Sequence, residues 1–223
     1  MIHSELRTPN LELQWYHSSM IVGSLTRTPA RIIAARTISA VMQPTLTVVP
    51  LLALFNGFHE PRVTMARWFL WCCVTITCAT TLPSILFLIM LKRGTIADLH
   101  VSNRSERPLA YGAMILCYTV GTELAHRTGA PRRTTLLMAA MTLCLMVGAA
   151  VNQMIFKFSL HTMSAALAAV ALPMAYGAAF LPALAVIGAV GWARVTLRAH
   201  TAGEMAAGVV VGVSVGMLVF SLL

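Results

Sequence analysis

Long apolar runs, each close to the thickness of a bilayer, are the feature that most constrains the fold of this chain. A helix needs about 20 apolar residues to cross the hydrocarbon core of a membrane, and backbone groups in lipid must find their hydrogen bonds within the segment. Seven runs reach or approach that length, at about residues 37–55, 68–91, 109–126, 134–156, 162–178, 181–197 and 202–222. The fifth and sixth runs are slightly short, so we predict an all-α polytopic membrane helix bundle with about six or seven transmembrane helices.

The composition supports insertion into a membrane and argues against several other classes of protein. Of the 223 residues, 58% are hydrophobic and 10% are charged, whereas about a quarter of a soluble domain is charged. The formal net charge of +9 suits loops that face anionic headgroups or a site for an anionic substrate. No soluble basic region is left over for nucleic acid, so we expect no nucleic-acid partner.

The chain divides into a polar N-terminal segment, residues 1–36, and a transmembrane domain, residues 37–223. The segment lacks the apolar core and small-residue cleavage site of a signal peptide. It either lies on the membrane surface, with Trp15 at the interface, or forms a partly ordered tail. Pro44 and Pro50 interrupt the first run, which membrane helices tolerate when neighbours satisfy the backbone.

Short-range patterns give three expectations about packing. Glu123 and Arg127 are four residues apart, so we expect a local ion pair. Asn152 and Gln153, near the end of the fourth run, are typical of hydrogen bonds between membrane helices. Small residues recur along the last run and favour close approach of another helix: Gly203, Gly208, Gly212 and Gly216.

Three polar patches interrupt the apolar runs, at residues 95–108, 157–161 and 192–204. Two runs separate the first patch from the second, and two more separate the second from the third. An even number of membrane crossings returns the chain to the same face, so counting predicts that all three patches meet there. Ionisable groups beside lipid-buried helices are costly and usually functional, which makes a composite site the leading hypothesis.

The patches together contain the side chains that phosphoryl transfer requires. Arginine presents a planar fork of donors that matches phosphate oxygens. Of two histidines, one can attack phosphorus and the other can protonate the leaving oxygen, and Glu204 lies one helical turn from His200, where it can hold the ring. The ionisable candidates are His100, Arg104, Arg107, Lys157, His161, Arg194, His200 and Glu204.

In these residues the chain resembles the type 2 phosphatidic acid phosphatases, membrane enzymes that share a catalytic core with vanadium haloperoxidases. The family motifs are K-x6-R-P, P-S-G-H and S-R-x5-H-x3-D. The order and spacing match over about residues 95–212, where the chain reads His100-x6-Arg107-Pro108, Phe158-Ser159-Leu160-His161 and Ala193-Arg194-x5-His200-x3-Glu204. Four positions depart from the motifs, as in a divergent bacterial branch: His100 for lysine, Leu160 for glycine, Ala193 for serine and Glu204 for aspartate.

The resemblance implies a role for each candidate. His200 is then the nucleophile, Glu204 orients it, and His161 is the general acid. The phosphate is bound by Arg107, Arg194 and Ser159, with His100, Lys157 and Arg104 as further candidates. Lys157 is a possible replacement for the missing family lysine, and no metal or other cofactor is expected.

We therefore expect a multi-pass protein of the cell membrane, a bacterial inner or plasma membrane, that hydrolyses a lipid-linked phosphate or pyrophosphate. A polyprenyl or a phosphatidate-like lipid both fit. Two alternatives stay open, a lipid phosphotransferase with the same phosphohistidine intermediate and a non-catalytic lipid-binding or transport protein. Purely structural roles also stay open, such as a polar pair between helices for His200 and Glu204, or headgroup contacts for the arginines. Basic residues divide too evenly between the two faces to decide which face carries the site.

Overall fold

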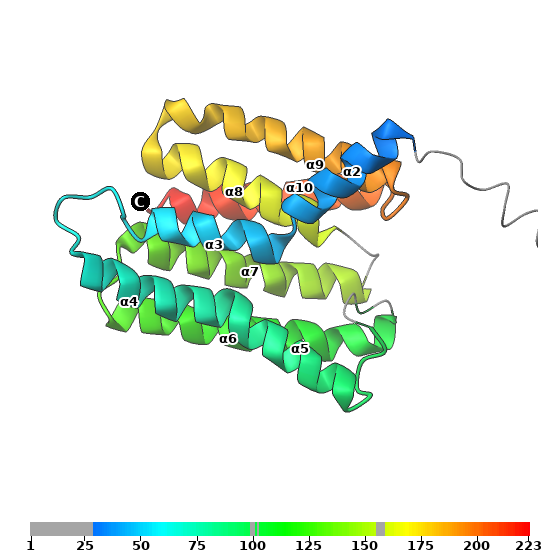
Figure 1. Ribbon diagram of the computed structural model, residues 1–223, viewed down its shortest axis with the longest axis horizontal. Coiled ribbons are helices and arrows are strands. Elements are labelled where there is room, and N and C mark those ends of the chain that lie inside the picture. The colour runs from blue at the N-terminus through cyan, green and yellow to red at the C-terminus, as the bar shows by residue number, and fades with distance from the viewer. Residues whose placement is uncertain (1–28, 99–100, 102, 155–158) are drawn as a thin grey trace, which may run out of the picture.

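The computed structural model describes residues 29–98, 101, 103–154 and 159–223, and it is a bundle of helices without a strand in those ranges (Figure 1). The first elements are α2 (Ala30–Val41), α3 (Pro44–Phe55), α4 (Met65–Ile76), the π-helical turn η1 (Thr77–Thr81) and α5 (Leu82–Lys92). The later ones are the 3-10 turn η2 (Arg104–Glu106), α6 (Arg107–Arg127), α7 (Arg132–Met154), α8 (Leu160–Tyr176), the 3-10 turn η3 (Ala178–Ala183), α9 (Leu184–Thr196) and α10 (Ala202–Phe220). The predicted all-α class is confirmed.

In the described part of the chain, four helical stretches are long and apolar enough to cross a membrane: Met65–Lys92, Arg132–Gln153, Ala178–Thr196 and Ala202–Phe220. The bent pair α2 and α3 makes a fifth if the two helices form one span. Helix α8 is apolar but has only 17 residues, and α6 is long enough but less apolar because Glu123 and several threonines and glycines interrupt it. All seven predicted runs map onto helices in the predicted order, whereas the count of six or seven spans is not confirmed.

The first run differs most from its predicted form. Its helix begins at Ala30, so the expected boundary after residue 36 falls inside α2. The run then breaks before Pro44, and α2 and α3 meet at 50°. Proline cannot donate a backbone hydrogen bond and favours the first turn of a helix, which explains why α3 starts there, whereas Pro50 lies within α3.

Helices α8 and α10 pack in parallel along a stripe of glycines (Figure 1). A Cβ added at Gly208 would lie 2.5 Å from Thr162 Oγ1, and one added at Gly212 would lie 2.3 Å from the carbonyl oxygen of Met163. The predicted close approach is confirmed for these two and for Gly216, but no described atom lies within 4 Å of the equivalent position at Gly203. Parallel packing at this distance brings the starts of α8 and α10 together.

A polar cluster ties the helices at the opposite end of the bundle. Arg133, at the start of α7, forms an ion pair with Glu60 and donates from Nε to the carbonyl oxygen of Phe55 at 3.1 Å. Its guanidinium also lies 5.0 Å from the centre of the Tyr176 ring at the end of α8. The predicted pair of Glu123 with Arg127 is present on the surface of α6.

Candidate active site

One end of the bundle collects the starts of α6, α8 and α10 and the ends of α7 and α9 (Figure 1). The described parts of all three polar patches therefore lie at the same end, as counting the runs predicted. Three helix starts also present their positive dipole ends there, which favours an anionic ligand. Two of the candidate residues, His100 and Lys157, lie outside the described residues.

His200 and Glu204 form the predicted contact at the start of α10. His200 Nδ1 lies 3.0 Å from Glu204 Oε2, and the side chain of His200 is only 7% exposed. Because a carboxylate accepts hydrogen bonds, the contact assigns the ring proton to Nδ1. In the neutral form of this ring the lone pair is on Nε2, which is the arrangement that a nucleophilic imidazole requires.

A capping box explains why a glutamate fits at residue 204. Thr201 caps α10, and its Oγ1 accepts from the backbone N–H of Glu204 at 3.3 Å. Glu204 reaches back so that the same Oε2 that contacts His200 accepts from the backbone N–H of Thr201 at 3.0 Å. The sequence signal for this cap is the spacing Thr-x-x-Glu before an apolar run, which the predicted role of Glu204 did not take into account.

The start of α8 is bound directly to the start of α10. The backbone N–H of Ser159 donates to the carbonyl oxygen of Glu204 at 3.2 Å. His161, the second residue of α8, is half-buried two residues further on. The second and third sequence motifs are therefore joined by a main-chain hydrogen bond.

Ser159 and Leu160 have structural roles at the start of α8. The Ser159 hydroxyl is buried and accepts from the backbone N–H of Thr162 at 3.4 Å, so it caps the helix; its predicted contact with phosphate stays a prediction. Leu160 has a helical backbone, which does not require glycine, and its side chain packs against the apolar core.

Two arginines of the first motif bind the last turn of α7. Arg107 donates from Nη1 to Asn152 Oδ1 at 3.1 Å and from Nε to the carbonyl oxygen of Val101 at 3.1 Å. Arg104 donates from Nη2 to the carbonyl oxygen of Gln153 at 2.7 Å. Asn152 thus bridges two helices as predicted, but its partner, Arg107, is a candidate phosphate ligand, a pairing that was not predicted.

Arg194 lies near the end of α9 and reaches α2. Its Nη1 donates to the Ser39 hydroxyl at 2.9 Å, while its Nε is buried without a hydrogen-bond partner among the described residues. Ser39 was not among the predicted site residues, because it lies in the first apolar run and outside the three polar patches. The structure therefore adds α2 to the elements around the site.

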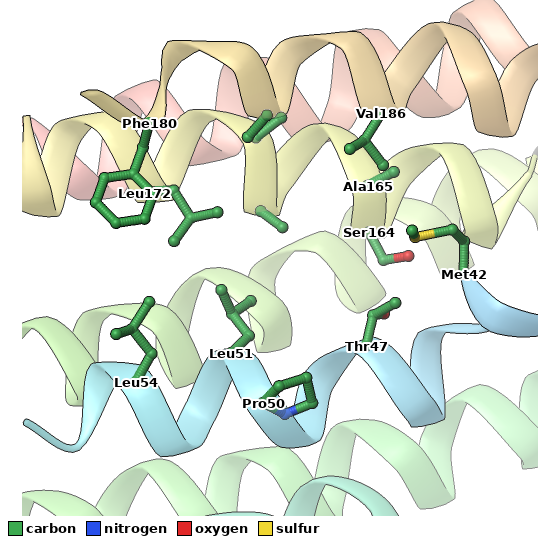
Figure 2. A pocket seen from close by; sticks show the side chains of 13 residues that line it. Met42, Thr47, Pro50, Leu51, Leu54, Ser164, Ala165, Leu172, Phe180 and Val186 are labelled. Atoms are coloured by element: carbon green, nitrogen blue, oxygen red, sulfur yellow. The ribbon is translucent and has the colours of Figure 1, made fainter. Parts of the chain in front are cut away.

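An apolar groove of about 320 Å³ runs between α3, α8 and the η3–α9 segment (Figure 2). Figure 2 shows Leu54 of α3 facing Leu172 of α8 and Thr47 of α3 facing Ser164 of α8 across the cavity, with Phe180 at one end. Ser164 marks the end nearest the site, since its hydroxyl donates to the carbonyl oxygen of His161 at 3.1 Å. The groove thus begins one helical turn from a candidate catalytic residue.

Within the described ranges, no group of three or more His, Cys, Asp or Glu side chains is arranged to hold a metal ion.

Comparison of the chain with protein-family models, with curated proteins and with solved structures gives no match.

Proposed function

We propose that this chain is an integral membrane phosphatase that hydrolyses a lipid-linked phosphate or pyrophosphate through a phosphohistidine intermediate. The observation that carries the proposal is the His200–Glu204 contact of 3.0 Å, joined by main-chain hydrogen bonding to the helix that bears His161. A buried imidazole with an oriented ring and a second histidine on the adjoining helix are the two groups that covalent phosphoryl transfer uses.

In the first step, His200 Nε2 attacks phosphorus while Glu204 stabilises the positive charge that develops on the ring. The bond between phosphorus and the leaving oxygen breaks, and that oxygen takes a proton from His161. The leaving group is a lipid alcohol if the substrate is a monophosphate and a lipid monophosphate if the substrate is a pyrophosphate.

In the second step, water attacks the phosphohistidine and returns a proton to His161. The bond between nitrogen and phosphorus breaks, inorganic phosphate leaves, and both histidines regain their starting states. Arg107 and Arg104, bound to the end of α7, and the positive ends of α8 and α10 stabilise the negative charge on phosphate in both steps. Arg194, on the α2 side, is the further candidate for this role.

The apolar groove supports a lipid as the substrate. Its walls are side chains of helices, and it begins one turn of α8 from His161. A hydrocarbon chain placed there lies among apolar side chains, an environment as apolar as the lipid tails that it leaves. The groove thus suits a phosphate ester with a long apolar chain and an end that reaches the histidines.

Release of inorganic phosphate from a prenyl pyrophosphate and from phosphatidic acid by the purified full-length chain tests the proposal. The variant His200→Ala should fall to the background rate, and His161→Ala should lose about 10²–10⁴-fold in rate. The matched control is His126→Ala, since His126 is exposed at the opposite end of α6. Equal release by wild type and His200→Ala would refute the catalytic role.

Three further measurements test the mechanism and separate the alternatives. Orthovanadate, which mimics a pentacoordinate phosphorus, should inhibit phosphate release. Transfer of phosphate to an added alcohol, in place of its release, would indicate a phosphotransferase. Lipid binding by wild type without either reaction would indicate a non-catalytic protein.

A further inference from the structure

The last turn of α7 carries a buried amide next to Arg107. Asn152 is only 3% exposed, and its Oδ1 accepts the hydrogen bond from Arg107 Nη1. A guanidinium has donors only, so the amide oxygen must face Arg107 and the amide nitrogen must lie beside it. Within the described part of the chain, that nitrogen, Nδ2, has no hydrogen-bond partner.

A hydrogen-bonded bridge between α6 and α7 accounts for the oxygen of the Asn152 amide but not for its nitrogen. The bridge uses Oδ1 and leaves two N–H donors buried, which is costly and rare in folded proteins. The donors lie on the same planar group that contacts Arg107, at the end of the bundle where three helices start. An acceptor with oxygen atoms, placed against Arg107, would satisfy them.

We propose that Asn152 is a phosphate-binding and positioning residue of the site. Its Oδ1 fixes the orientation of the Arg107 guanidinium, and its Nδ2 donates to a non-bridging oxygen of the bound phosphate group. The proposal rests on the proposed phosphate site, but it concerns binding and does not require turnover.

The variant Asn152→Asp separates this role from a purely structural one. Aspartate has the same shape and keeps an acceptor for Arg107, so the bridge between the helices persists. It replaces the donor by a second anionic oxygen, which repels phosphate. The matched control is Gln43→Glu, because Gln43 is exposed just before α3 at the same end of the bundle and undergoes the same change from amide to carboxylate.

The readout is the affinity of the purified full-length chain for orthovanadate and for inorganic phosphate, measured beside thermal unfolding. We expect Asn152→Asp to lose at least about tenfold in affinity, the effect of one hydrogen bond to a charged group, and to raise KM in the phosphatase assay. Gln43→Glu should bind within about twofold of wild type. If Asn152→Asp does not fold, Asn152→Ala, which is tolerated in helices, should show the same loss.

The alternative is that Asn152 affects phosphate binding only by orienting Arg107. It is tested by introducing Asn152→Asp into an Arg107→Gln background. A loss that persists there supports direct donation by Nδ2, and a loss that disappears overturns it. Unchanged affinity in the folded single variant also overturns the proposal. Turnover by wild type together with unchanged affinity in Asn152→Asp would refute this inference alone, whereas phosphate binding without turnover would refute only the proposed reaction.

Discussion

Replacing Glu204 by glutamine tests whether its contact with His200 is catalytic or only structural. The carboxylate is 22% exposed, and its Oε2 lies 3.0 Å from both His200 Nδ1 and the backbone nitrogen of Thr201. Glutamine has the same length but no charge, and its amide can turn an N–H toward Nδ1. The ring proton would then move to Nε2 and block the lone pair that attacks phosphorus in the proposed reaction.

The expected changes in stability and in rate differ widely in size. Neutralising a charged hydrogen bond and a favourable charge at a helix start costs about 1–2 kcal/mol of unfolding free energy. The melting temperature should therefore fall by about 2–4 °C per kcal/mol. The rate should fall much further, by about 10⁴-fold, as it does when the carboxylate that orients a catalytic histidine becomes an amide.

Thr201→Ala is the matched control for this prediction. It removes the Oγ1 that accepts from the backbone of Glu204 and should cost about 0.5–2 kcal/mol, but it leaves the carboxylate beside His200. Phosphate release and thermal unfolding at a fixed scan rate are measured for both variants. If the kcat of Glu204→Gln equals that of Thr201→Ala, the contact of Glu204 with His200 is only a structural bridge and the catalytic assignment fails.

Three further predictions concern packing, stability and the groove. Gly212→Ala should destabilise the protein by about 1–3 kcal/mol, because the new Cβ would lie 2.3 Å from a main-chain oxygen of α8; Gly188→Ala, within α9 and with no described atom within 4 Å of the new Cβ, should keep the melting temperature or raise it by about 2–4 °C, and equal melting temperatures of the two variants would contradict the close packing. Arg133→Ala leaves Glu60, whose side chain is 35% exposed, without its partner, so it should cost about 1–3 kcal/mol yet leave KM unchanged in the phosphatase assay, and a change in KM alone would contradict a structural role. Ala168→Phe narrows the groove, which Ala168 lines, and should raise KM for a long-chain lipid phosphate by about tenfold, since the clash of the added ring with the chain costs about 1–3 kcal/mol; p-nitrophenyl phosphate, which has no chain, is the control substrate, and equal effects on both substrates would show that the groove does not bind the chain.

The order of helices and the end at which the polar patches meet follow from the sequence because both depend on local information. Apolar length and turn residues mark each helix, and the number of crossings fixes which ends share a face. The contact of His200 with Glu204 was also predictable, since a spacing of four residues on a helix start brings two side chains together. These relations hold within one segment or between neighbours in the chain.

Other features depend on how distant segments pack. The 50° bend between α2 and α3 and the hydrogen bond from Arg194 to Ser39 require the placement of α9 against α2, which no local pattern encodes. The partnership of Arg107 with Asn152 joins residues 45 positions apart, so the sequence could indicate that Asn152 would bond to another helix but not to which group.

The sequence by itself determined an all-helical membrane-type chain, the helices in their order and the shared end of the three polar patches, because periodicity, run length and parity are properties of the chain alone. Only the tertiary structure decided how the site is assembled. Parallel packing of α8 on the glycines of α10 brings Ser159 to Glu204, and the end of α7 selects the partners of Arg107 and Arg104. The physical reason is that hydrogen bonds between distant segments form only where packing has already brought backbone and buried side chains within reach.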